Sequence, residues 1–329
     1  MDINALFENF KQQRIAVIGD VMIDAYLSGK VSRISPEAPV PIVNFESREE
    51  RLGGAANVAL NLLSLGAKVT ICSVVGKDQA GQTMQKLMEN ESIDTSGIVY
   101  SVQRMTTVKT RVVGNKQQLL RVDQEQTTDL NKEEENELLL KIEKIVLSGI
   151  DALIFEDYNK GVLTEKVIRE AIKLANNHDV ITTVDPKLKN FLAYQEVSLF
   201  KPNFKELQEG LKKTVNIQNE SELKSSVLAL KNVLKAENIF VTLSEHGVVM
   251  MTDSSFYHYP AHLRNIADVS GAGDTVISVA TLCLVAGVTP EIIAQIANLA
   301  GGLVCEKLGV VAIQKELLHQ EIEKLIATC

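Results

Sequence analysis

The amino-acid sequence predicts an α/β protein in which helices cover both faces of a mostly parallel central sheet, with a small β lid added. Short β-branched runs alternate with longer helical patterns along the chain, which is typical of strands joined by crossover helices. The runs are also continuously apolar, as strands buried on both faces are. Two stretches that break this rhythm predict the lid. The expected architecture is therefore a three-layer α/β/α fold.

The alternation extends over most of the chain. The expected strands are Ile15–Ile18, Val69–Val75, Leu153–Phe155 and Ile181–Val184, and the expected helices are Ala55–Leu65, Ala80–Asn90, Leu138–Val146, Thr164–Ala175 and Val276–Ala286. No linker rich in proline, glycine or serine divides the chain. We therefore expect residues 1–329 to form a single domain.

The two stretches outside the alternation are residues 26–46 and 99–123, where polar and apolar residues mix in short strand-like runs. They predict a small antiparallel excursion from the main sheet. Such an excursion can act as a lid over a cleft, or it can be a β-meander that only faces solvent. The pattern alone leaves both interpretations open.

Composition argues against several classes of protein. Acidic residues outnumber basic ones, 42 to 34, and the net charge of −8 gives no general attraction for nucleic acid or for an anionic membrane. No apolar run reaches the roughly 18 residues of a membrane span, and the N-terminus lacks a signal-peptide pattern. The cysteines show no metal or disulfide spacing, which predicts free thiols in a cytoplasmic protein: Cys72, Cys283, Cys305 and Cys329.

The segment Asp268–Thr275 (DVSGAGDT) carries the clearest chemistry, because its small residues stand where a loop becomes a helix N-terminus. Backbone N–H groups at Gly271, Ala272 and Gly273 would be unpaired there, and the helix dipole favours phosphate oxygens. Asp274 is unsuited to binding phosphate, since like charges repel, but it can take a proton from a hydroxyl that attacks the phosphate. The alternative is a helix cap beside a tight turn.

A second candidate site contains Asn203 and Glu206, which are three residues apart and therefore share one face of a helix. Together they can order a hydrated Mg²⁺ ion. The same spacing also forms a capping box, with Asn203 as N-cap and Glu206 as the third helical residue. By itself the local pattern favours the capping box.

Near the N-terminus, Asp24 follows the first expected strand at the edge where open α/β sheets bind ligands, and carboxylates there can hold sugar hydroxyls. Gly53 and Gly54 precede an expected helix, as Gly271 and Gly273 do later in the chain. A close turn from strand to helix would need these glycines, but it would not need Asn57.

A further candidate joins two strand-like runs through Thr242, Ser244 and Gly247. The hydroxyl groups could contact ATP phosphates or ribose. Taken alone, the segment is an ordinary turn.

In this order along the chain, the segments resemble the ribokinase-like (PfkB) family of carbohydrate kinases over about residues 14–313. The family's DTxGAGD pattern appears as Asp268–Asp274, its Gly-Gly motif as Gly53-Gly54, and its NxxE motif as Asn203 to Glu206. The resemblance implies a ribokinase-like fold, ATP as phosphate donor, Mg²⁺ and a monovalent cation, K⁺. Lid strands pair between subunits in such kinases, which implies a homodimer.

The resemblance also implies a role for each candidate. Asp274 would be the general base, the amides from Gly271 to Gly273 would stabilise the transferred phosphoryl group, and Asn203 and Glu206 would position Mg²⁺ through water. The other implied contacts are Asp24, Gly53, Gly54 and Asn57 with the sugar, Asn203, Thr242, Ser244 and Gly247 with ATP, Asn298 and Gly302 near its adenine, and Asp268 with K⁺ beside the Gly309–Ile313 loop.

Within the family, Ser32–Pro41, Gly53–Ala59 and Gln117–Asp123 are most similar to the kinases that phosphorylate D-glycero-β-D-manno-heptose 7-phosphate at C1, on the route to ADP-heptose and lipopolysaccharide. The expected partner is thus a small sugar phosphate. Cations suit its distal phosphate, and the candidates are Lys109, Arg111 and Lys187.

Two alternatives stay open, namely another sugar or nucleoside kinase of the family and a non-catalytic sugar or nucleotide sensor. The sequence contains no HxGH-type motif, so we expect no nucleotidyltransferase domain and a kinase step alone.

Overall fold

The computed structural model describes residues 2–262 and 264–327, which form two β-sheets and the helices around them. The larger sheet has nine strands in the order β13-β12-β11-β10-β9-β8-β1-β4-β5. The strands from β11 to β5 are parallel, whereas β12 and β13 are antiparallel at one edge. The predicted mostly parallel sheet is confirmed.

All four strands expected from apolar runs belong to this sheet. Its strands are β1 Arg14–Gly19, β4 Lys68–Gly76, β5 Asp94–Ser101, β8 Ala152–Glu156, β9 Ile181–Asp185, β10 Leu199–Phe200, β11 Asn238–Thr242, β12 Val248–Met251 and β13 Phe256–Tyr259. Side chains alternate between the two faces: Ile15 and Val17 of β1 join one hydrophobic core, and Ala16 and Ile18 join the other. Both faces of the large sheet are therefore covered, which explains why its strands are continuously apolar.

Helices form the two outer layers. One core contains side chains of α1 Ile3–Phe10, α2 Ala55–Ser64, α3 Gln79–Asn90, α8 Ala272–Val285, α9 Pro290–Val304 and α10 Lys315–Ala327. The other contains side chains of α4 Lys132–Leu147, α5 Glu165–Asn177, α6 Phe204–Leu211 and α7 Glu220–Leu234. Two 3₁₀ turns, η1 Leu188–Asn190 and η2 Ser244–His246, lie between elements. The expected helices are present.

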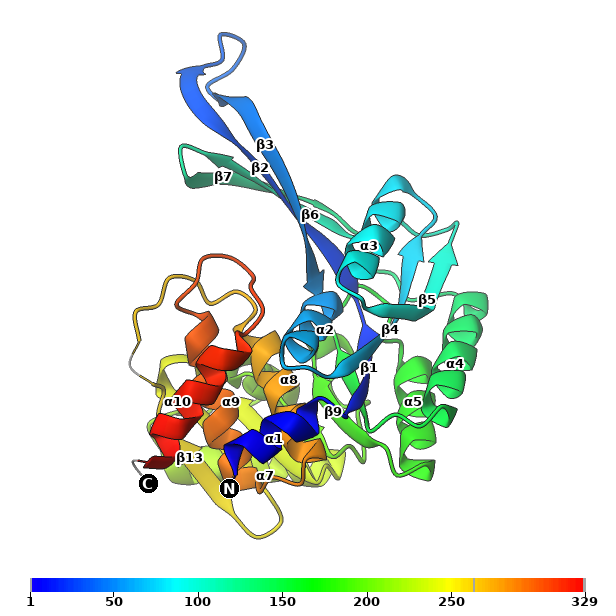
Figure 1. Cartoon of the computed structure of the whole chain (residues 1–329), viewed down its shortest axis with the longest axis vertical. Helices are drawn as coiled ribbons and strands as arrows, with labels where there is room; N and C mark the ends of the chain where they lie inside the picture. The colour runs from blue at the N-terminus through cyan, green and yellow to red at the C-terminus, as the bar shows by residue number, and fades with distance from the viewer. Residues whose placement is uncertain (1, 263, 328–329) are drawn as a thin grey trace.

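The smaller sheet contains β2 Val21–Ile34, β3 Pro41–Gly54, β6 Val108–Gly114 and β7 Gln117–Gln124, in the order β3-β2-β6-β7. Figure 1 shows that this small sheet extends away from the body that holds the helices. It contains most of the two stretches that break the strand–helix alternation.

Two details of the predicted lid were wrong. Val99–Ser101 belongs to β5 of the large sheet, and the small sheet is mixed, because β2 and β6 pair in parallel. The reason is topological: β2 follows β1, and β6 follows β5, and both preceding strands point the same way in the large sheet. Strands that continue from parallel strands keep a common direction.

Cys72 and Cys283 are buried free thiols, and Cys305 is a half-buried one. Cys329 lies outside the described residues. Among the helices of residues 2–262 and 264–327, we find none with both the length and the apolar character needed to cross a bilayer.

Candidate active site

Asp274 lies in the first turn of α8, and the glycine before that helix permits its position. Gly271 is the N-cap residue and has a φ of 81°, in the left-handed region that glycine adopts without strain. A Cβ atom at Gly271 would lie only 3.1 Å from the side-chain nitrogen of Asn57. Glycine is therefore needed both for the turn and for the close approach of α2.

Each carboxylate oxygen of Asp274 accepts a hydrogen bond from another part of the chain. Asn57 Nδ2 donates to Oδ2 at 2.6 Å, and the Tyr158 hydroxyl donates to Oδ1 at 2.9 Å. Burial raises the pKa of Asp274, while the two donated bonds favour its charged form. The side chain is thus directed toward α2 and the loop after β8, which a simple helix cap would not require.

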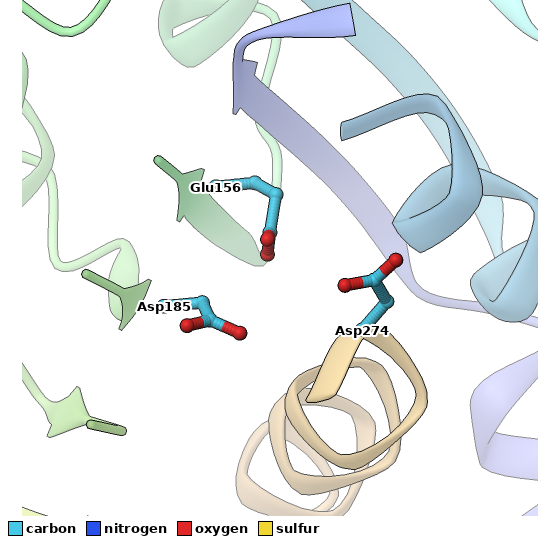
Figure 2. Close-up of side chains that lie close together, drawn as sticks. All are labelled: Glu156, Asp185 and Asp274. Atoms are coloured by element: carbon cyan, nitrogen blue, oxygen red, sulfur yellow. The ribbon is translucent and has the colours of Figure 1, made fainter. Parts of the chain in front are cut away.

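Two further carboxylates face Asp274. Figure 2 shows Glu156, Asp185 and Asp274 pointing toward one another; one oxygen atom of each lies within 4.8 Å of the others, and all three residues are buried. Glu156 ends β8 and Asp185 ends β9, and the two are paired across these neighbouring parallel strands. Their proximity follows because the carboxyl ends of parallel strands meet at one edge of the sheet.

The two strand-end carboxylates differ in their surroundings. Lys201 Nζ lies 2.7 Å from Asp185, and Lys187 Nζ lies 3.6 Å away. Burial opposes the charge of Asp185, but the two lysines outweigh it and lower its pKa. Neither oxygen of Glu156 has a hydrogen-bond partner within the described chain, and burial raises the pKa of Glu156 well above its usual value.

Tyr158 connects Asp274 with two cationic side chains. The ammonium of Lys109 lies 5.7 Å from the centre of its ring, and that of Lys187 lies 5.6 Å away, both within cation–π range. Burial raises the pKa of Tyr158 well above its usual value, so its hydroxyl stays protonated and can donate to Asp274. Lys109 belongs to β6, so the small sheet reaches this centre.

The glycines before α2 are required by close contacts. A Cβ atom at Gly53 would overlap the carboxylate of Asp24, and one at Gly54, which has a φ of 61°, would overlap the carbonyl oxygen of Asp20. The close turn from strand to helix is therefore present. It also sets the direction of α2, which carries Asn57 to Asp274.

Asp24 lies on β2 and forms an ion pair with Arg111 on β6. Register places Asp24 opposite Lys109 and Tyr26 opposite Arg111, so these side chains share one face of the small sheet. Arg111 also lies over the Tyr26 ring at 5.3 Å. Asp24, the predicted sugar ligand, therefore lies on the same face as Lys109 and Arg111, the predicted phosphate ligands. Asp24 and Arg111 already form an ion pair with each other.

Asn203 and Glu206 form the capping box that their spacing predicts. Asn203 Oδ1 accepts from the Glu206 backbone, and Glu206 Oε2 accepts from the Asn203 backbone at 2.8 Å. The other oxygen, Glu206 Oε1, accepts from Lys187 Nζ at 2.9 Å. Each oxygen of Glu206 therefore has a donor already.

The residues predicted to contact ATP lie on segments that contact one another. Asn203 forms a β-bridge with Thr242, and η2, which starts at Ser244, follows. A Cβ atom at Gly247 would overlap the carbonyl oxygen of Tyr259, next to the Pro260 carbonyl that accepts from Asn298.

Gly302 lies one turn after Asn298 on α9, where a Cβ atom would be 3.3 Å from Arg264. Both residues therefore face the segment before α8. Asp268, in that segment, accepts backbone N–H groups of Ser270 at 2.9 Å and Gly309 at 3.0 Å. The expected proximity of Asp268 to the loop that begins at Gly309 is present.

Sequence reasoning did not select Glu156, Tyr158, Asp185 or Lys201 as site residues. The sequence does contain a signal for three of these residues. Glu156, Asp185 and Lys201 are charged residues that directly follow the apolar runs of β8, β9 and β10. Asp20 follows β1 in the same way, but its carboxylate accepts backbone N–H groups of Tyr158, Lys160 and Val162 and so organises the loop after β8.

The chain is similar to curated bacterial proteins. It is 40% identical over 298 residues to the bifunctional protein HldE of Helicobacter pylori (strain HPAG1), covering 90% of this chain and 64% of that protein. It is 39% identical over 309 residues to the protein of the same name from Methylobacillus flagellatus, covering 94% of this chain and 63% of that protein. The chain thus spans less than two thirds of these relatives.

Solved structures share the fold at low sequence identity. Phosphofructokinase-2 from Escherichia coli in complex with potassium has a TM-score of 0.79 at 17% identity, covering 96% of this chain and 99% of that chain. Ribokinase from Arabidopsis thaliana, complexed with ribose and ATP, has a TM-score of 0.72 at 12% identity, covering 94% and 99%. The fold is ribokinase-like.

Residues 12–316 match the family described as pfkB family carbohydrate kinase. This match covers most of the chain, including the small sheet, the carboxylate cluster and α8. The chain therefore belongs to the pfkB family of carbohydrate kinases and is a phosphotransferase.

Proposed function

We propose that this kinase transfers the γ-phosphate of ATP to the anomeric C1 hydroxyl of D-glycero-β-D-manno-heptose 7-phosphate, giving the 1,7-bisphosphate. The observation that carries the chemistry is Asp274, a buried carboxylate held by Asn57 and Tyr158 in the first turn of α8. The substrate rests on the sequence resemblance and on the HldE relatives. Because the chain spans less than two thirds of those relatives, the proposal is limited to the kinase step.

In the proposed reaction, Asp274 accepts the proton of the C1 hydroxyl as that oxygen attacks the γ-phosphate. Gly273 and Asp274 are first-turn residues of α8, so their N–H groups have no intrahelical acceptor and can stabilise the transferred phosphoryl group together with that of Gly271. The N–H of Ala272, which the sequence predicted to be unpaired, already donates to the Val269 carbonyl at 3.3 Å. Asn57 and Tyr158 keep the carboxylate in one orientation.

The charged face of the small sheet is the proposed sugar-phosphate site. Asp24 and the glycines Gly53 and Gly54 would contact sugar hydroxyls, while Lys109 and Arg111 would contact the distal phosphate. The supporting observation is that Asp24, Lys109 and Arg111 share one face, with Lys109 beside Tyr158. In this role the small sheet is a lid that also excludes water from the phosphoryl group.

ATP is proposed to lie along Thr242, Ser244, Gly247, Asn298 and Gly302, which occupy neighbouring segments. Mg²⁺, bound with ATP, would neutralise charge that develops on the phosphates. Asn203 and Glu206 fit a water-mediated contact better than a direct one, since both Glu206 oxygens already have donors. Lys187 would shift from Glu206 toward a phosphate oxygen.

Asp268 beside Gly309 is the proposed K⁺ site. The loop contact supports it, because the Gly309 N–H donates to the Asp268 carboxylate at 3.0 Å and so brings the start of the 309–313 loop beside this carboxylate.

We also propose a homodimer of cytoplasmic subunits, in which the outer faces of two small sheets pack together. Exposed apolar residues lie on the face opposite the charged one, beside the Arg48–Glu50 ion pair: Leu120 and Val122 of β7 are 50% and 54% exposed, and Phe45 of β3 is 67% exposed. Covering such side chains stabilises association.

Product identification tests the proposed reaction. With heptose 7-phosphate and ATP, ³¹P NMR is expected to show ADP and a new anomeric phosphate, while the 7-phosphate resonance remains. The same mixture with Asp274→Asn protein is the matched control. A higher kcat/KM for ribose, fructose 1-phosphate or a nucleoside would replace the heptose assignment by another sugar kinase, and tight sugar binding without turnover would indicate a sensor.

Replacing Tyr158 with phenylalanine is expected to move the acid limb of the kcat/KM profile to higher pH. The reaction needs ionised Asp274, and the Tyr158 hydroxyl favours that charged form. Without the hydroxyl the pKa of Asp274 rises, so activity is lost at a higher pH as the solution is acidified. The measurement is kcat/KM against pH, with Tyr100→Phe as the control that keeps the wild-type profile. An unchanged profile for Tyr158→Phe would contradict this role.

A further inference from the structure

We propose that Asn61, a buried asparagine of α2, is a positioning residue for phosphoryl transfer. Its side chain holds the Asn57–Asp274 pair and the 309–313 loop in one arrangement. Because the exposure of Asn61 is 0%, it acts only through the residues that it contacts. The inference rests on the proposed role of Asp274 as the base, but it does not depend on which sugar is the substrate.

Asn61 is a polar residue at a position where the fold alone would favour an apolar one. Its neighbours on α2, Val58, Ala59 and Leu62, are buried members of a hydrophobic core. Asparagine is also among the weaker helix formers, and burial of its amide is costly unless hydrogen bonds replace those to water. The side chain is therefore explained by the specific arrangement that its hydrogen bonds fix, not by packing of the core.

The carboxamide of Asn61 forms hydrogen bonds with three segments of the chain. Its Nδ2 donates to the Asn57 carbonyl at 2.9 Å, one turn earlier in α2. Its Oδ1 accepts from the Thr275 hydroxyl at 2.9 Å and from the Ile313 N–H at 3.0 Å. One side chain thus joins α2, α8 and the end of the 309–313 loop.

Two of these contacts adjoin the proposed base. Thr275 directly follows Asp274 in α8, and the side chain of Asn57 donates to Asp274 Oδ2 at 2.6 Å. Asp274 is therefore connected to Asn61 from two sides, through the backbone of α8 and through Asn57. Loss of the Asn61 contacts would let α2 shift against α8, and this shift would misplace the carboxylate that accepts the proton.

The third contact fixes the loop that passes beside the glycine turn of α8. The first residue of this loop, Gly309, is held by the segment before α8, and its last residue, Ile313, is held by Asn61. Between them, a side-chain carbon of Val310 lies 3.3 Å from the position of a Cβ atom at Gly271. The loop is thus held at both ends against the N-terminus of α8, where the phosphoryl group is proposed to bind.

Replacement of Thr275 by valine and by serine tests the proposal. Thr275→Val keeps the shape of the side chain but removes the donor to Asn61, so kcat with ATP and heptose 7-phosphate is expected to fall about tenfold to 100-fold. Thr275→Ser keeps the hydroxyl and should retain most of the wild-type kcat. KM for both substrates should change little, because Thr275 is fully buried and cannot touch a substrate.

Thr281→Val is the matched control. Thr281 lies on the same helix, is equally buried, and shares a hydrogen bond of 2.7 Å with the Thr183 hydroxyl, away from the base. Its replacement should lower Tm as that of Thr275 does, yet leave kcat at the wild-type value. The comparison separates positioning of the base from a general loosening of α8.

Asn61→Leu is a stronger perturbation of the same network. Leucine has the branching of asparagine without its polar atoms, so all three hydrogen bonds are lost at once. In a protein that circular dichroism shows to be folded, kcat should fall at least as far as in Thr275→Val. Asn238→Leu is its control, because Asn238 is a buried asparagine of β11 that donates to the Ser198 carbonyl at 2.9 Å, and its kcat should stay at the wild-type value.

A Thr275→Val protein with the wild-type kcat would overturn the inference, and so would an equal loss of kcat in Thr281→Val. Asp274→Asn, measured in the same assay, separates this failure from that of the proposed reaction. If Asp274→Asn loses kcat and Thr275→Val does not, the inference alone fails. If Asp274→Asn keeps its kcat, the proposed base fails, and the inference fails with it.

Discussion

Replacing Asp274 with asparagine is expected to lower kcat by about 10²- to 10⁴-fold, the range that a positioned general base contributes. The amide keeps the size of the side chain but cannot accept the proton of the sugar hydroxyl. Substrate binding should change much less, because the proposed sugar and ATP contacts lie on other residues. The loss should therefore appear in kcat and not in KM.

Steady-state kinetics with ATP and heptose 7-phosphate, together with a thermal melt, provide the measurement for Asp274→Asn. Asp94→Asn is the matched control, since Asp94 is an exposed aspartate at the start of β5 that accepts hydrogen bonds from Ser96 and Thr70. An Asp274→Asn protein that retained most of its kcat would remove Asp274 from the role of base.

Gly54→Ala is expected to lower the free energy of unfolding by about 3 kcal/mol or more and to reduce activity with it. The φ of 61° and ψ of −136° at Gly54 lie where non-glycine residues are strained, by about 1–3 kcal/mol. The added methyl group would also overlap the carbonyl oxygen of Asp20. Relief of that overlap must move the start of α2, and Asn57 with it.

Denaturant unfolding and kcat/KM test this second prediction. Gly287→Ala is an informative control, because Gly287 also has a positive φ, 72°, yet a Cβ atom there would meet nothing within 4 Å. It should cost only the left-handed penalty of about 1 kcal/mol. Equal destabilisation in the two variants would show that the contact with Asp20 is unimportant.

The large sheet could be predicted from the sequence because its strands are short, apolar and buried on both faces. The run Leu153–Phe155, for example, identified β8 without any knowledge of its neighbours. The direction of β6 relative to β2 could not be predicted in this way. That pairing depends on how β1 and β5 are ordered in the sheet, which is information about contacts between distant segments.

The residues of the candidate site also fall into two groups, those selected from the sequence and those recognised only in the structure. Asp274 and Asn57 were selected as candidates because each follows a glycine turn before a helix, and the family resemblance implied their roles. Glu156 and Tyr158 were not, because their importance comes from what lies opposite them: Asp185 on the next strand and Asp274 on α8. The absence of partners around Glu156 is a property of the folded surroundings alone.

One consequence follows from the way β2 continues from β1. Asp20 alone separates the two strands, and its carboxylate is anchored to the loop that carries Tyr158. The small sheet thus begins at a residue that is fixed to the same loop as Tyr158. Lys109 of this sheet lies over the Tyr158 ring, whose hydroxyl donates to Asp274, so a single aromatic side chain connects the small sheet with the proposed base.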